Sequence, residues 1–392
     1  MKSGTPGFSG QRLREAREVR GAQQLFLAEM LGVSAQAVSN YERGRSTPSP
    51  EMLDRLVAVL NVPPTFFRLP ERPEVERTVF YRSMSSATKS ARSRAEHRAN
   101  WLGDITRYVS TFVQLPEPNI PDFGVPEDPL QLAGSDVEQL AVRARSYWGM
   151  RDEPVGNMLT LMENQGVVVA RDKLGAATLD SLSEFGTVSQ RPLVLIGTDK
   201  GTPARWRFDV AHELGHLIMH RNLERRRLRN VAEHKQIENQ AHRFAGAFLL
   251  PQAAFSEDLF AASLDAMLAI KPRWRTSIAM MIMRSRQTHL IDESMEKRLW
   301  INYSRRGWRS GEPLDDSMER EAPRLLRRSF ELIFEAQAQS AEDVEMNIGL
   351  PAPDIESLAG LPERFLERGF APVVLRGNVD WSSNVTPLRH RS

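Results

Sequence analysis

The chain has 392 residues, of which 41% are hydrophobic and 26% charged, and its formal net charge is +2. This composition is typical of a soluble globular protein, and the length predicts roughly two or three domains. The sequence contains no cysteine, which excludes disulfides and thiolate zinc sites, so histidine and carboxylate side chains have to hold any metal. No apolar run approaches the roughly 18 residues of a membrane helix, and residues 1–10 lack the apolar stretch of a secretion signal. We therefore expect a cytoplasmic protein that does not contact membranes.

Residues 8–68 show short helical patterns that are interrupted by glycines, and we expect an all-α domain here. A helix with the small residue Ala28 at its crossing point ends at Gly32, and Ser34 is placed to cap a second helix. The second helix keeps polar side chains on its outer face, and such side chains suit hydrogen bonding to base edges in the major groove. These outward residues are Gln36, Ser39 and Asn40.

The run from Ala28 to Gly44 resembles the Cro/CI-type (XRE) helix-turn-helix family over about 55 residues. This resemblance implies binding to double-stranded DNA, with Gln24 at the phosphates. The residues expected at the DNA are Gln24, Ser34, Ala35, Gln36, Ser39, Asn40, Arg43 and Arg45. Many relatives carry a longer side chain at the position of Ala35, and the alternative is a motif kept only for protein contacts. Because such proteins bind paired half-sites, we expect a homodimer.

Residues 69–99 are interpreted as a basic linker, since six Lys or Arg residues stand against one Glu between Arg77 and Arg98. A solvated helix face is the favoured reading of these charges, and phosphate contact or docking between domains is the alternative. Further helices are expected over 95–115, 137–148 and 157–163, strands over 166–170 and 192–197, and a proline-rich crossing loop over 115–129.

The segment from His212 to His216 reads H-E-x-x-H within an apolar-periodic run that predicts a helix. Residues four apart lie on one helix face about 6 Å apart, so both imidazoles can reach one metal ion. Glu213 would then lie beside the metal, where a carboxylate takes a proton from metal-bound water. Gly215 predicts close packing of another backbone. The alternative is a buried helix with two hydrogen-bonded histidines.

A third ligand is expected from a second helix that begins near Ile237, whose small residues permit close packing against the first. Glu238 is the best candidate and would leave a fourth position open for water, while His234 and His242 are rivals. His220 lies one turn beyond His216, too far to be a ligand, and His220 and His242 are candidates to orient the ligands from behind. The edge of the predicted sheet is suited to take an extended peptide as an added strand.

Residues 207–220, 238–245 and 249–251 together resemble the ImmA/IrrE family of metallopeptidases, and the resemblance covers roughly residues 100–300. It implies one Zn2+ per chain on His212, His216 and Glu238, with Glu213 as general base. His242 departs from the family, in which Asn is usual at this position. Relatives with this fold cleave a Cro/CI-type repressor and so switch on the genes that it silences.

The expected fold class is therefore α+β and mainly helical, with a zincin-like domain that combines a small sheet and the H-E-x-x-H helix. Its expected parts are the helix-turn-helix domain 8–68, the linker 69–99, the metallopeptidase domain 100–300, a helical C-terminal region 301–376 and a disordered tail 377–392. A helical segment over 272–281 is expected to be structural, and helices are also expected over 317–338 and 350–366.

The expected function is that of a DNA-binding regulator with a zinc endopeptidase domain, linked to stress or mobile elements. The substrate would be a separate repressor or the chain's own linker near residues 68–76. One alternative is a transcription factor that uses the metallopeptidase fold without cleavage, as a sensor or dimerisation module. A weaker alternative is a middle domain that binds a small ligand.

Overall fold

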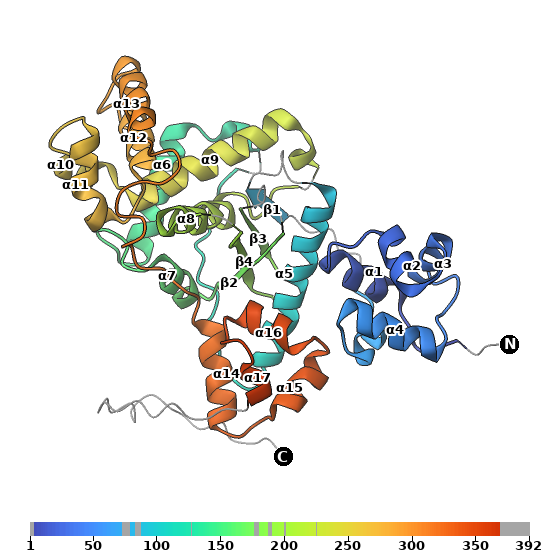
Figure 1. Ribbon diagram of the computed structural model, residues 1–392. Coiled ribbons are helices and arrows are strands. Elements are labelled where there is room, and N and C mark those ends of the chain that lie inside the picture. Colours follow the sequence, from blue (N-terminus) through green and yellow to red (C-terminus); the bar gives the residue numbers. More distant parts are fainter. Residues whose placement is uncertain are drawn as a thin grey trace.

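The computed structural model describes residues 4–72, 79–82, 88–126, 128–175, 180–186, 190–199, 201–224 and 226–368. The tail over 377–392 and part of the 68–76 segment, both named above, lie outside the described residues. The chain is α+β and mainly helical, as expected from its sequence. A helical N-terminal domain, a central domain around a small sheet and a C-terminal group of helices follow one another along the chain (Figure 1).

The N-terminal domain contains the predicted helix-turn-helix. Its elements are α1 (Gly10–Val19), α2 (Gln24–Leu31), α3 (Ala35–Glu42), α4 (Pro50–Leu60) and the 3-10 helix η1 (Pro64–Arg68). Gly32 ends α2 in the left-handed region at φ 68°, and the side chain of Ser34 accepts a hydrogen bond from the Ala37 N–H at the start of α3. Ala28 is buried at the crossing of the helices. These features confirm the expected turn and cap.

The sheet of the central domain has the strand order β1-β3-β4-β2. Its strands are β1 (Val79–Arg82), β2 (Val168–Asp172), β3 (Ser181–Phe185) and β4 (Pro192–Gly197). β2 pairs with β4 in parallel, and the other two pairings are antiparallel. β2 and β4 were expected because each has a continuous apolar run in the sequence. Such a run is typical of a strand that is buried on both faces of the sheet. β1 and β3 were not expected, since each is short and lacks such a run.

Two apolar cores lie on the two faces of the sheet. On one face, α5 (Lys89–Val109) packs with Val168 and Leu195, and on the other, α8 (Pro203–Met219) packs with Val169 and Ile196. Neighbouring residues of one strand therefore belong to different cores, as the two-residue repeat of a strand requires. The helices α6 (Gly134–Tyr147), α7 (Met158–Asn164) and α9 (Val231–Leu249) complete the second core. The loop expected over 115–129 carries no helix or strand among its described residues until η2 (Pro129–Gln131).

The remaining helices divide between the two cores. On the side of α8 and α9 lie η3 (Arg227–Arg229), α10 (Gln252–Asp258), α11 (Leu264–Trp274), α12 (Ile278–Gln287) and α13 (Glu293–Arg305). Beside α5 lie α14 (Leu325–Glu335), α15 (Ala341–Ile348), α16 (Ala352–Ala359) and α17 (Phe365–Arg368). The segment expected to be helical over 272–281 is broken at Arg275, which has φ 51°. The helix expected over 317–338 begins only at Leu325, just after Pro323.

The segment expected to be a basic linker, 69–99, instead contributes β1 and the first half of α5 to the fold. Arg98 is 4% exposed, and its guanidinium pairs with Asp172 of β2 and Asp354 of α16. Arg72 bridges Glu15 of α1 and Asp104 of α5 at 2.9 and 2.6 Å. These two arginines therefore serve docking rather than a solvated face. Among the described helices, none is long and apolar enough to cross a membrane.

Candidate metal centre

The H-E-x-x-H segment lies within α8, which begins with Thr202 as N-cap and Pro203 in its first turn. The apolar stripe of Val210, Leu214, Leu217 and Ile218 is buried in the core between the sheet and α9. A Cβ atom at Gly215 would lie 3.2 Å from the Cβ atom of Phe244 on α9. Close packing at this glycine is confirmed, although the nearest atoms belong to the Phe244 side chain and not to a backbone. The crossing brings the second helix beside the histidines.

Three side chains form what we call the metal cluster: His212, His216 and Glu238. The Nε2 atoms of the two histidines lie 3.0 Å apart. The Glu238 carboxylate lies 3.5 Å from the Nε2 atom of His212 and 3.3 Å from that of His216. Two donor atoms on a tetrahedral Zn2+ with bonds of about 2.0–2.1 Å are separated by about 3.3–3.4 Å. The donor types and spacings therefore fit a zinc ion.

The protonation states of the cluster also suit a cation. Burial lowers the pKa of His212 well below its ordinary value, so the imidazole is neutral. Burial alone would raise the pKa of Glu238, but the neighbouring rings of His212 and His216 bring this pKa below its usual range. A metal ion needs neutral imidazoles and an ionised carboxylate, and both forms are favoured here.

A chain of hydrogen bonds behind the cluster fixes which nitrogen of His216 is free. The Gln240 amide N–H groups donate to the carbonyl oxygens of Pro129 and Leu132, so its Oε1 atom must accept from His220 Nε2 at 3.0 Å. His220 Nδ1 is then a lone pair, which accepts from His216 Nδ1–H at 3.0 Å. This leaves a lone pair on His216 Nε2, the atom that points into the cluster. Burial lowers the pKa of His220 to about 3 and keeps its ring neutral.

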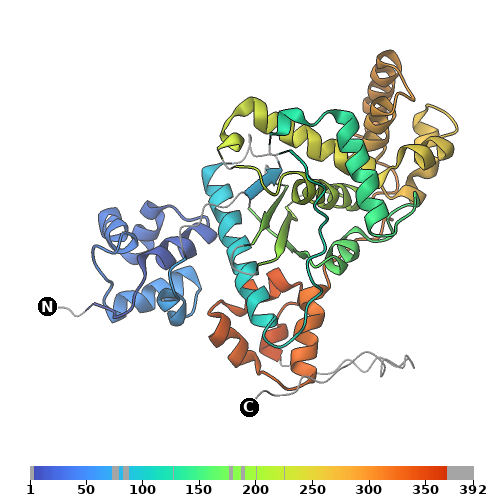
Figure 2. The ribbon, with the colours of Figure 1, turned by 180° about the vertical axis from the view of Figure 1, so that it is seen from behind.

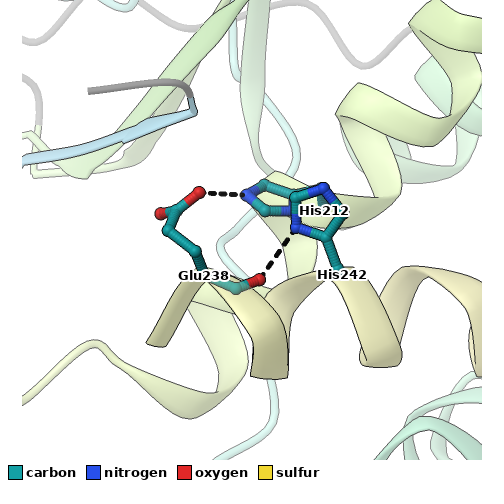
Figure 3. A group of neighbouring side chains, drawn as sticks. All are labelled: His212, Glu238 and His242. Carbon is teal, nitrogen blue, oxygen red and sulfur yellow. Dashed lines mark hydrogen bonds and ion pairs between the residues drawn. The ribbon is translucent and has the colours of Figure 1, made fainter. Parts of the chain in front are cut away.

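His242 is a fourth donor at the same place. Its Nδ1 atom lies 2.9 Å from the backbone carbonyl of Glu238, which can only accept, so Nδ1 carries a proton and Nε2 is the ligand atom of the neutral ring. The ligand atoms of His212, Glu238 and His242 lie within 4.8 Å of one another (Figure 3). The other rival, His234, has its Nε2 atom 3.9 Å from the Glu238 carboxylate. His242 therefore lies beside two members of the metal cluster, His212 and Glu238.

Glu213 is fully buried beside the cluster, with a side chain that faces the sheet. Its Oε1 atom accepts a hydrogen bond of 2.5 Å from the Ser181 hydroxyl on β3, and burial raises the pKa of the carboxyl group. A raised pKa suits a group that has to accept and release a proton near neutral pH. The contact with Ser181 was not foreseen, although serines at 181 and 183 alternate in the sequence and so share one face of a strand.

Two hollows meet at His242. A cleft of about 960 Å³ runs along α9 and is lined by Glu238 and His242 on one side and by Asp180 and Arg205 on the other. A second hollow of about 400 Å³ lies beyond His242 and is lined in part by Phe208, Met280, Met283 and Trp308. A cleft with several charged side chains and a more apolar pocket thus lie next to the candidate metal ligands.

The helix-turn-helix presents most of its expected DNA contacts to solvent. α3 lies on the side of the N-terminal domain that faces away from the sheet (Figures 1 and 2). On α3, Gln36 donates to Asn40 at 2.9 Å in an exposed pair. The side chains of Ser34, Arg43 and Arg45 are exposed as well, and Ala35 is half-buried.

Two of the expected DNA contacts differ in their surroundings. Ser39 is only 8% exposed, because it lies on the side of α3 that packs against the rest of the domain, so it does not share the open face. Gln24 is half-buried and donates to the Glu42 carboxylate at 2.6 Å. It would have to exchange this bond for one to a phosphate.

Comparison with protein families matches two separate parts of the chain. Residues 13–67 match the helix-turn-helix family model, and residues 162–286 match that of Peptidase M78, the IrrE N-terminal-like domain. The first match covers α2 and α3, and the second covers the metal cluster, Glu213 and His242. No curated protein matches the chain. The two matches confirm the fusion that the sequence indicated.

Proposed function

Because one chain joins an XRE-type helix-turn-helix to an IrrE-like peptidase domain, we propose that this protein is a cytoplasmic DNA-binding regulator with zinc-dependent endopeptidase activity. Its DNA-binding part would act through α3 as a homodimer on double-stranded DNA. Its substrate would be a Cro/CI-type repressor or another copy of this chain, and cleavage would change the expression of the genes that the repressor controls.

The observation that carries the endopeptidase proposal is the spacing of 3.0–3.5 Å among the donor atoms of His212, His216 and Glu238, next to the buried carboxyl of Glu213. One zinc ion per chain on these three ligands would supply Lewis acidity and lower the pKa of water to about 7. Glu213 would accept the proton that this water loses and pass it to the leaving amine. Ser181 holds the Glu213 carboxyl in place, and Gln240 acting through His220 holds the ring of His216.

The test is a comparison of the wild-type protein with the Glu213→Gln variant. Zinc-loaded wild type is incubated with itself, with a purified Cro/CI-type repressor and with fluorescent casein, and fragments are read by mass spectrometry. We expect Glu213→Gln to retain zinc and DNA binding and to lose cleavage by about 100-fold or more. Glu257→Gln, an exposed change on α10, is the matched control. Wild type with one zinc per chain that cuts none of these proteins would contradict the proposal.

One observation favours a second function, that of a regulator which does not cleave. Zinc sites with four protein ligands are closed and structural, whereas catalytic sites keep a position open. His242 presents an Nε2 lone pair near His212 and Glu238 and is able to close the site. X-ray absorption on the zinc-loaded protein separates the two: three histidine nitrogens in the wild type support the closed site, and two support the open one.

A further inference from the structure

The strand nearest the candidate catalytic residues is β3, and it is paired with a neighbouring strand along both of its edges. On one side it pairs with β4, and on the other with β1, a strand from the segment between the helix-turn-helix and α5. β3 packs against α8 and carries Ser181, which holds the Glu213 carboxyl. The side of β3 that faces away from β4 is thus a place where an added strand would lie next to the Ser181–Glu213 contact, and β1, the edge strand of the sheet, occupies it.

β1 reaches into the site through Phe80. The phenyl ring is 2% exposed and stacks on the His216 imidazole, with centroids 4.6 Å apart and an interplanar angle of 11°. Leu223, Leu228 and Ile237 form a small apolar cluster around it. Phe80 is therefore held tightly against a side chain of the metal cluster.

The register of the antiparallel β1–β3 pair places alternate residues of β1 on the face of the sheet that carries Ser181 and Ser183. Phe80 lies opposite Ser183, and Arg82 lies opposite Ser181, the residue bonded to Glu213. Because facing residues of an antiparallel pair share one face of the sheet, positions 80 and 82 are on the face of Ser181 and Ser183. Val79, one residue away, belongs to the opposite core, with α5.

The side chains of the candidate catalytic residues are buried in this arrangement. His212, Glu213 and His216 are each 0% exposed. The cleft along α9 reaches the metal cluster at Glu238, but β1 covers the side of β3 that faces away from β4. A substrate that pairs with β3 as an added strand would need the place of β1.

We propose that the side of β3 that faces away from β4 is the peptide-binding site of the metal centre and that β1 occupies it as an internal substitute for substrate. The ligand it takes is an extended peptide segment, paired antiparallel with residues 181–185, with an aromatic side chain opposite Ser183. Binding of such a segment requires β1 to leave. This inference rests on the proposed endopeptidase function, but the binding of a peptide to β3 can be tested without any cleavage.

A reversible covalent lock tests the proposal directly, since the chain has no cysteine of its own. Val79 and Glu184 face each other across the β1–β3 pair, on the face away from the metal cluster. The double variant Val79→Cys, Glu184→Cys in a Glu213→Gln background holds β1 on β3 when oxidised. The probe is a fluorescent acetyl-Val-Phe-Tyr-Arg-amide peptide, a copy of residues 79–82, and its binding is followed by anisotropy. We expect binding to be lost on oxidation and restored by a phosphine reductant.

The opposite change loosens β1. Phe80→Ser removes the ring on His216, while Leu228→Ser weakens the same small cluster from η3 and serves as control. The apparent affinity for peptide scales with the fraction of molecules in which the site is open. We therefore expect Phe80→Ser to bind the probe about tenfold more tightly than the control and, with Glu213 intact, to cut casein faster by a similar factor.

The outcomes separate the two proposals. If Phe80→Ser strengthens peptide binding and the oxidised pair abolishes it, but no variant cuts any protein, the peptide site is supported and the endopeptidase function fails. If locked and reduced protein bind the probe equally, or if Phe80→Ser binds no better than Leu228→Ser while zinc is retained, the inference is overturned. The same cysteine pair in a chain that keeps Glu213 gives a further outcome: cleavage by this oxidised protein at the wild-type rate would overturn the inference as well.

Discussion

The DNA-binding face and the metal centre of this chain are built in opposite ways. α3 presents Gln36, Asn40 and Arg43 to solvent, on the side of the molecule away from the sheet. The metal centre lies between the sheet, α8 and α9, and His212 and His216 are fully buried. The DNA-binding face is exposed as it stands, whereas our proposal requires β1 to leave β3 before a peptide can pair with that strand. One chain therefore combines an exposed binding face with a site whose histidines are buried.

The two regions are joined by buried charges rather than by a free linker. Arg20 of α1 and Arg98 of α5 both pair with Asp354 of α16, and the Trp101 indole N–H donates to Glu15 of α1 at 2.7 Å. Arg98 also pairs with Asp172 at the end of β2. The sheet, the C-terminal helices and the DNA-binding domain thus meet at one ionic cluster.

The largest expected difference between the two regions is produced by His216→Ala, which should abolish zinc binding and leave DNA binding unchanged. Removing one of three ligands should take zinc binding from one ion per chain to none after dialysis, because two remaining ligands hold zinc poorly. Binding to duplex DNA should not change. Zinc is measured by plasma emission spectrometry, with the exposed His289→Ala as control. Full retention of zinc would place the site on His212, Glu238 and His242 instead.

The ionic cluster between the two regions is tested by Arg98→Ala. The change leaves the carboxylates of Asp172 and Asp354, which are 5% and 8% exposed, without their shared cation. Loss of one partner from a buried ion pair costs about 3–5 kcal/mol. Urea unfolding should show this loss of stability. Arg107→Ala, at an exposed arginine paired with Asp104, should cost less than about 1 kcal/mol. Equal effects of the two changes would show that the cluster does not hold the parts together.

A smaller effect is expected where a residue only orients a ligand. Gln240→Leu removes the acceptor of His220 and the donor to two backbone carbonyls, so the ring of His216 is no longer fixed. Loss of such an outer partner lowers metal affinity by about 10–100-fold. Competition with a chromogenic chelator measures the change, and Gln236→Leu, one turn earlier on α9, is the control. Unchanged affinity would mean that packing alone holds the ring.

The smallest effects are expected on the open face. Arg43→Ala and Arg45→Ala each remove an exposed cation that is expected to contact a phosphate. Each should reduce the slope of log K against log salt by about one on calf-thymus DNA and leave zinc binding unchanged. Fluorescence titration at several salt concentrations measures the slope. Slopes equal to that of the wild type would show that these arginines do not contact DNA phosphates.

The sequence predicted best where a local pattern carried the structure. The helices α2, α3, α8 and α9 follow from apolar periodicity, from the turn at Gly32 and from the small residues around Ala241. Close packing at Gly215 was also foreseen, and the approach of Phe244 confirms it. The spacing of the cluster follows from the same local rule, because two histidines four apart share a helix face.

Features that depend on pairing between distant segments were missed. β1 and β3 are short strands that pair with each other across about 100 residues of sequence, and neither contains a continuous apolar run. The sequence predicts a linker in the region of β1, because its many basic residues are typical of a solvated face. Arg98 shows why that reading fails: its two partners, Asp172 and Asp354, are brought together only by the fold.

The position of β1 within the chain has a quantitative consequence. A segment joined covalently to the site it occupies acts as a competitor at an effective concentration on the order of millimolar, whatever the concentration of the protein. Dilution cannot remove it, and a free peptide with the same intrinsic affinity would have to exceed that concentration to replace it. A protein partner that also binds elsewhere on the molecule would gain a comparable local concentration of its own. The chain would thereby discriminate against peptides that merely diffuse past and in favour of partners that first dock.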